Sequence, residues 1–177
     1  MLEPAPGGCA AGRAESGGVT GLSGRTIAIT GAARGIGHAT ARAAAAAGMR
    51  VAIGDLDGEL SERAAAELAG EAVGLELDVR DRDAFAAFLD EVERRLGPID
   101  VLVNNAGVLH LGEFAAEQPE QTERQIAINL TAVLHGSRLA LDRFRPRDRG
   151  HLVNVASSAS PARSATSCAA PASARRS

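Results

Sequence analysis

Residues 26–37 read TIAITGAARGIG, a short apolar run followed directly by a glycine-rich turn and then by an alanine-rich stretch. The alternating Thr, Ile and Ala residues suit a buried β-strand. Glycines at positions 31, 35 and 37 are typical of a turn that leads from a strand into a helix while its backbone approaches a bound phosphate. The segment therefore predicts the first βα unit of a parallel α/β sheet.

The same alternation of short apolar runs and helical patterns continues to about residue 155, and it is typical of a parallel sheet covered by helices. The predicted strands are 26–30, 50–54, 72–77, 99–104 and 151–155, and the predicted helices are 35–47, 58–68, 82–96 and about 120–144. Right-handed crossovers would give the strand order 3-2-1-4-5. We therefore predict a doubly wound parallel sheet, a Rossmann fold, that is incomplete.

Both ends of the chain differ in composition from the middle. Residues 1–24 are rich in Gly, Ala and Ser and predict a disordered tail, whereas 25–160 form the single predicted domain. Residues 161–177 read PARSATSCAAPASARRS and offer almost no apolar side chains for a core. This stretch is either a disordered tail or the product of a reading frame lost near residue 160. We favour the second, because GC-rich codons read out of frame give Ala, Arg, Pro and Ser.

Composition excludes several classes of protein. The 177 residues carry a net charge of -3, which gives no general attraction to nucleic acid. Cys9 and Cys168 do not form a disulfide framework, and the scattered histidines predict no metal site. The sequence has no signal peptide and no apolar run of membrane-spanning length, so a cytoplasmic location is expected. Arginines 143, 145, 147 and 149 are expected to form a solvated connection into the last strand.

Asp55 ends the second predicted strand, 24 residues after Gly31. An acid at this place can accept hydrogen bonds from the ribose hydroxyls of an adenine dinucleotide, and it would repel a 2′-phosphate. Arg34 has the opposite tendency, because its guanidinium could pair with that phosphate or contact the pyrophosphate. NAD is therefore favoured and NADP stays open. Taken alone, Asp55 would be an ordinary turn residue before Asp57 and Gly58.

Further motifs follow in order along the chain: TGAARGIG at 30–37, LDV at 77–79, NNAG at 104–107, INL at 128–130 and NVASS at 154–158. With these motifs on its predicted elements, the chain resembles the classical short-chain dehydrogenases/reductases from Arg25 to about Ser158. The resemblance implies hydride transfer between the nicotinamide of NAD or NADP and a small-molecule alcohol or carbonyl substrate. It also implies a homo-oligomer and gives no reason to expect a membrane or nucleic-acid partner.

The resemblance also assigns roles to particular residues. It implies that Asn129 holds a water of the proton relay through its helix backbone and that Ser158 hydrogen-bonds the substrate carbonyl. Asp78 would lie beside the adenine, although a helix cap is the ordinary alternative for such a residue. The full set implied to bind the cofactor is Gly31, Arg34, Gly35, Ile36, Gly37, Asp55, Asp78, Val79, Asn105, Ala106 and Gly107.

The catalytic pair of the family is missing, because the chain contains no tyrosine and all 19 of its basic residues are arginine. The family's spacing from Ser158 places the tyrosine at Pro171 and the lysine at Arg175. Proline has no hydroxyl to move a proton, so we expect this chain to be nearly inactive. Two hypotheses stay open: a truncated or frameshifted oxidoreductase, and a non-catalytic dinucleotide-binding or subunit-pairing protein. The coding DNA after codon 160 would distinguish them.

The last predicted strand, 151–155, would lie at an edge of the sheet with no further strand beside it. Exposed edges and uncovered apolar faces promote association. We therefore expect this chain to be marginally stable and to form ill-defined oligomers.

Overall fold

The computed structural model describes residues 21–110, 112 and 114–157. Most of the two predicted tails lies outside the described residues. The same is true of both cysteines, of Ser158, and of the positions Pro171 and Arg175.

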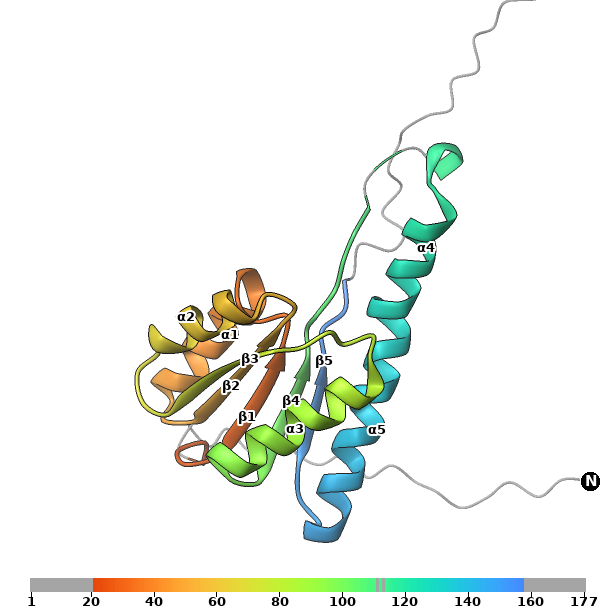
Figure 1. The fold of residues 1–177 in the computed structure, drawn as a ribbon. Helices are drawn as coiled ribbons and strands as arrows, with labels where there is room; N and C mark the ends of the chain where they lie inside the picture. Colours follow the sequence, from red (N-terminus) through yellow and green to blue (C-terminus); the bar gives the residue numbers. More distant parts are fainter. Residues whose placement is uncertain (1–20, 111, 113, 158–177) are drawn as a thin grey trace, which may run out of the picture.

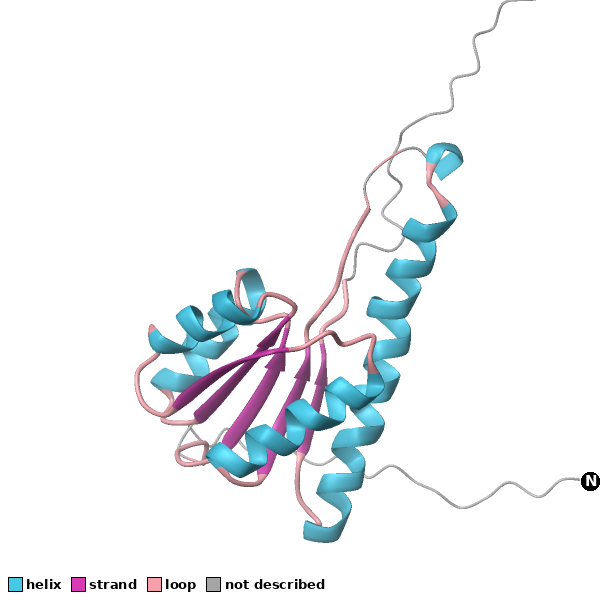
Figure 2. Ribbon diagram, viewed as in Figure 1, coloured by secondary structure: helices cyan, strands magenta, loops and turns pink. Residues whose placement is uncertain are grey.

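The sheet has five parallel strands in the order β3-β2-β1-β4-β5, which confirms the predicted topology (Figures 1 and 2). All five residues of β1, in the middle of the sheet, are buried. The strands are β1 Thr26–Thr30, β2 Arg50–Asp55, β3 Ala72–Glu76, β4 Ile99–Asn104 and β5 His151–Asn154.

Helices follow the strands where the sequence predicts them. The side chain of Asp57 caps α2 by accepting the Leu60 N–H at 2.9 Å, and Asp81 caps α3 in the same way. The helices are α1 Gly35–Ala46, α2 Gly58–Ala66, α3 Arg82–Leu96, α4 Pro119–Ile126 and α5 Ala132–Phe144, with short 3-10 turns η1 Phe114–Ala116 and η3 Arg145–Arg147.

Successive side chains of each strand point to opposite faces of the sheet, and this alternation produces two hydrophobic cores. Ile27 and Ile29 pack with the alanines of α1 and α2, where small side chains let the helices lie close to the strands. Ala28 points to the other face and joins the core formed with α3 and α5, which contains Phe85 and Phe144. Both faces of the central strands are therefore covered, as a parallel sheet requires.

The predicted long helix from about residue 120 to 144 contains an irregularity. Between α4 and α5 the segment η2, Ala127–Thr131, is π-helical, and the Ala132 N–H donates to the Ala127 carbonyl. The π-turn contains one residue more than an α-helical turn. Asn129, at its centre, forms hydrogen bonds with both the backbone N–H and the backbone carbonyl of Val108. Single π-turns are often found at functional sites.

The expectation that the arginines near residue 145 form a solvated connection is wrong for Arg143 and Arg147, whose side chains are largely buried, whereas Arg149 is exposed as expected but also forms an ion pair. Arg143 is mostly buried and pairs with Asp90 and Glu93 of α3. Arg149 lies 2.9 Å from Asp100, and Arg147 is on the same carboxylate at 3.9 Å. Asp100 is only 2% exposed, and a buried carboxylate requires such partners. The partners are distant in sequence, so local composition could not reveal them.

Candidate functional site

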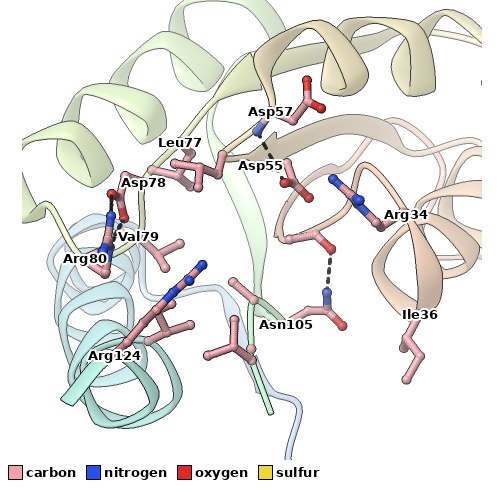
Figure 3. A pocket seen from close by; sticks show the side chains of 16 residues that line it. Arg34, Ile36, Asp55, Asp57, Leu77, Asp78, Val79, Arg80, Asn105 and Arg124 are labelled. Carbon is pink, nitrogen blue, oxygen red and sulfur yellow. Dashed lines mark hydrogen bonds and ion pairs between the residues drawn. The ribbon is translucent and has the colours of Figure 1, made fainter. Parts of the chain in front are cut away.

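A cleft of about 850 Å³ opens at the carboxyl ends of the strands (Figure 3). Ligands of open α/β sheets bind at this edge, where the order of the strands reverses. The residues that line the cleft are Gly31, Arg34, Ile36, Asp55, Leu56, Asp57, Leu77, Asp78, Val79, Arg80, Asn105, Ala106, Gly107, Val108, Arg124 and Ile128.

Two of the three glycines of the predicted turn, Gly31 and Gly37, are required by their surroundings. A Cβ atom at Gly31 would lie 2.7 Å from the Ala106 Cα, and one at Gly37 would lie 2.6 Å from the Gly31 carbonyl oxygen. Gly35 differs from both, because a Cβ there would meet nothing within 4 Å. Its φ of +60° nevertheless favours glycine. The turn is thus packed tightly against the protein at Gly31 and Gly37 and faces open space at Gly35.

The start of α1 has free hydrogen-bond donors beside this open space. Arg34 occupies the N-cap position in an extended conformation, and no side chain caps the helix. The His38 N–H donates to the Arg34 carbonyl at 3.3 Å, as the first backbone bond of the helix. The N–H groups of residues 35–37 therefore have no partner within the helix, and such a terminus attracts an anion.

Hydrogen bonds join the glycine turn to the end of β4. The Thr30 hydroxyl accepts the backbone N–H groups of Asn105 at 3.1 Å and Ala106 at 3.0 Å. In return, the Asn105 side-chain amide donates to the carbonyls of Thr30 at 2.9 Å and Gly31 at 3.0 Å. These hydrogen bonds fix the glycine turn relative to the end of β4, and the residues that form them belong to the predicted motifs TGAARGIG and NNAG.

Asp55 lies at the end of β2 and points into the cleft near Arg34 (Figure 3). One carboxylate oxygen accepts the Ala33 N–H at 3.2 Å, and the other lies 3.5 Å from the Asp57 nitrogen. The carboxylate thus supports the glycine turn, and it keeps acceptor capacity toward the cleft.

Asp78 lies between β3 and α3 and is bound by Arg80. The Arg80 Nε donates to both carboxylate oxygens, at 2.9 and 3.1 Å, and the Arg80 backbone N–H donates to one of them at 3.0 Å. The Arg80 guanidinium holds the pKa of Asp78 below its ordinary value. The alternative that Asp78 is a helix cap is wrong, because Asp81 caps α3.

Asn129 does not line the cleft, but it is hydrogen-bonded to Val108, which does. Its side-chain oxygen accepts the Val108 N–H at 2.9 Å, and its amide donates to the Val108 carbonyl at 2.7 Å. This paired contact fixes the segment that follows β4. The predicted substrate contact Ser158 lies outside the described residues.

Of the residues predicted to bind the cofactor, the cleft brings together all except Gly35 and Gly37, which shape the turn behind Ile36. Sequence reasoning missed several lining residues. Arg80 and Val108 directly follow predicted motifs, so extending each of these motifs by one residue would have found them. The missed lining residues are Leu56, Asp57, Leu77, Arg80, Val108, Arg124 and Ile128.

The described part of the chain contains no cluster of three or more His, Cys, Asp or Glu side chains suited to a metal ion. It also contains no helix with the length and apolar character needed to span a bilayer.

Comparison with known proteins identifies the family of this chain. A model of the family described as short chain dehydrogenase matches residues 25–173. The probable oxidoreductase EphD of Mycobacterium tuberculosis is 40% identical over 152 residues, which cover 83% of this chain and 26% of that protein. The inactive 2-(S)-hydroxypropyl-CoM dehydrogenase 2 of Xanthobacter autotrophicus is 43% identical over 117 residues, covering 66% of this chain and 51% of that protein.

A solved structure agrees with these matches. The 3-ketoacyl-(acyl-carrier-protein) reductase from Brucella melitensis, complexed with NADH, superposes with a TM-score of 0.73 at 30% sequence identity. The alignment covers 77% of this chain and 58% of the reductase. The chain thus spans between about a quarter and just over half of the length of these relatives. By sequence match and by fold, this chain belongs to the short-chain dehydrogenase family.

Proposed function

We propose that this chain binds an adenine dinucleotide, with NAD favoured over NADP, in the cleft at the carboxyl ends of β1–β4. The observation that carries the proposal is the uncapped start of α1 at Gly35, where an added Cβ atom would meet no atom of the described residues within 4 Å. The donor set fits a pyrophosphate, because backbone N–H groups at a helix start bind anions. The related reductase from Brucella melitensis is complexed with NADH, which supports the same choice.

The preference for NAD rests on Asp55. Its carboxylate would accept hydrogen bonds from the adenosine ribose, and it would repel the added charge of a 2′-phosphate. Arg34 is the opposing residue, because it is exposed in the same cleft and forms no ion pair with any described residue. Asp55 is anchored to the glycine turn by the Ala33 N–H, whereas Arg34 is not anchored. We therefore give the carboxylate more weight.

We further propose that the 177-residue chain, by itself, does not complete the chemistry of its family. When bound, a nicotinamide supplies or accepts the hydride. A proton must also be moved, and the chain has neither a tyrosine nor a lysine to do so. One relative carries the word inactive in its own name. The second candidate function is therefore a non-catalytic dinucleotide-binding or subunit-pairing protein.

Calorimetric titration with NAD and NADP tests the proposal. Gly35→Asp introduces a negative charge and a strained side chain beside the pyrophosphate site, and we expect NAD affinity to fall at least about tenfold. Gly70→Asp is the matched control, because Gly70 also has a positive φ of 88° and open space, but lies in the turn between α2 and β3. Equal NAD affinity of the wild type and Gly35→Asp would contradict the proposed binding site. Tighter binding of NADP than of NAD would contradict the stated preference for NAD.

A turnover assay tests the proposal on chemistry. We expect no oxidation of a simple secondary alcohol with NAD above the level of a Ser158→Ala control. Turnover clearly above that level would show that another group moves the proton.

A further inference from the structure

Arg124 is the one side chain from α4 among the residues that line the cleft. It comes from outside all of the motifs described above. Figure 3 shows it pointing into the cleft on the side of Asp78 and Val79, away from the glycine turn. Helix α4, which carries Arg124, extends beyond the carboxyl ends of the strands (Figure 1).

The guanidinium of Arg124 has no hydrogen-bond or ion-pair partner among the described residues. Arg80, in the same cleft, is bound to both oxygens of Asp78. Arg124, in contrast, is exposed and has no hydrogen bond or ion pair from its side chain to any described residue. It also borders a second cavity of about 470 Å³. Its charge lies close enough to contribute to the lowered pKa of Asp78.

The walls near Arg124 suit a flat and largely apolar group. Val79 and Ile128 line this end of the cleft, and both are only 8% exposed. Asp78 lies beside them with its carboxylate already neutralised by Arg80. The free helix donors that suit phosphate lie at the other end, by Gly35. A planar base resting on Val79 and Ile128 would leave its outer face to Arg124.

We propose that Arg124 stacks its guanidinium on the adenine ring of the bound dinucleotide and so closes the adenine end of the cleft. The inference rests on the proposed function, because it concerns the same site. Planar guanidinium groups stack on nucleobases, and the interaction of a cation with a π-system adds to the contact. A phosphate contact is the competing use of an arginine, and it would depend on charge rather than on a flat surface.

Three variants separate these uses in calorimetric titrations with NAD. Arg124→Met keeps the length of the side chain but loses its charge and its plane. Arg124→Lys keeps the charge and loses the plane. Arg138→Met is the matched control, because Arg138 is an exposed arginine of α5 that does not line either cavity and its loss changes the net charge equally. Circular dichroism melts establish that each variant is folded.

We expect Arg124→Met and Arg124→Lys to bind NAD about three- to tenfold more weakly, and Arg138→Met to bind like the wild type. Wild-type affinity in Arg124→Met would overturn the inference and leave the proposed function intact. Wild-type affinity in Arg124→Lys would overturn stacking in favour of a charge contact, and an equal loss in Arg138→Met would assign the effect to net charge. If the wild-type chain does not bind NAD, the proposed function itself fails.

Discussion

The two edge strands of the sheet differ in how they are covered. At one edge, β3 has Gly74 against the backbone of Ser61 in α2, while Val73 packs into the core on the opposite face. At the other edge, Leu152 of β5 packs on the core with α3 and α5, but Val153 is 43% exposed. Val153 pairs in register with the buried Val103 and so lies on the face of α1 and α2, which do not reach β5.

This difference separates two parts of the molecule with different tasks. Strands β1–β3 are covered by α1 and α2 on one face, and this part of the molecule contains the glycine turn and Asp55. Val153 of β5 and Val155 just after it are partly exposed, and the described residues do not cover this apolar face, which lies at the side where the predicted substrate contact would follow. The expectation of ill-defined oligomers stays a prediction, and the face of Val153 and Val155 is the surface through which association would occur.

Breaking the covered edge should have the largest effect. A Cβ atom at Gly74 would lie 2.1 Å from the Ser61 carbonyl group, so Gly74→Ala forces the backbone of α2 away from β3. We expect the free energy of unfolding to fall by about 3 kcal/mol or more, measured by urea denaturation. Gly21→Ala adds the same methyl group in open space and should be close to neutral. Similar values for the two variants would show that the β3 edge is not tightly packed.

A matched pair of valines tests the same comparison, and the expected change in the free energy of unfolding is of intermediate size. Val103 is 4% exposed and its register partner Val153 is 43% exposed, although the two lie on the same face. We expect Val103→Ala to lower the free energy of unfolding by about 2 kcal/mol through lost burial and a cavity. Val153→Ala should change it by less than about 0.5 kcal/mol. If Val153→Ala is as costly as Val103→Ala, the face of β5 is covered in solution.

The fold was predictable because its signals are local and repeated. TIAIT followed by GAARGIG fixes a strand, a turn and a helix start within a few residues, and the strand order then follows from crossover handedness. The π-turn η2 was not predictable, because it depends on the contact of Asn129 with Val108, which lies 21 residues earlier in the chain. The pairing of Arg149 with Asp100 was missed for the same reason.

The site was predictable to the extent that motifs mark it. Glycines and polar residues at the ends of β1–β4 gather in one cleft because parallel strands bring their carboxyl ends to one edge. Arg124 escaped prediction, since nothing in the local pattern of α4 distinguishes an arginine that faces a cleft from one that faces solvent. The role of Arg34 was not predictable, because it depends on the molecule that binds in the cleft.

The smallest expected effect concerns α3, whose buried side chains belong to the core on the face of the sheet opposite α1 and α2. Glu91 accepts hydrogen bonds from Arg94 at 2.7 Å and from Arg95 in the last turn of the helix. The Arg94 contact, followed by that of Arg95, lowers the pKa of Glu91 from 4.5 to about 2. In the unfolded chain these contacts are lost, so the carboxylate binds its proton more readily there.

A carboxyl group whose pKa is lowered by folding stabilises the fold above its unfolded pKa, and this contribution is lost as the pH falls through the folded pKa. The advantage of wild type over Glu91→Gln should thus be constant above about pH 5 and should shrink between pH 4.5 and 2. Urea denaturation from pH 7 to pH 3 measures this difference in the free energy of unfolding. Glu62→Gln is the control for the lost charge, because Glu62 is exposed on α2 and has no ion pair with any described residue. The effect should be small at every pH, since exposed ion pairs contribute little, and 1 M salt should reduce it further. An advantage that grows as the pH falls below 4.5 would mean that Glu91 stabilises the helix in its protonated form, and the ion pairs would then not be the cause.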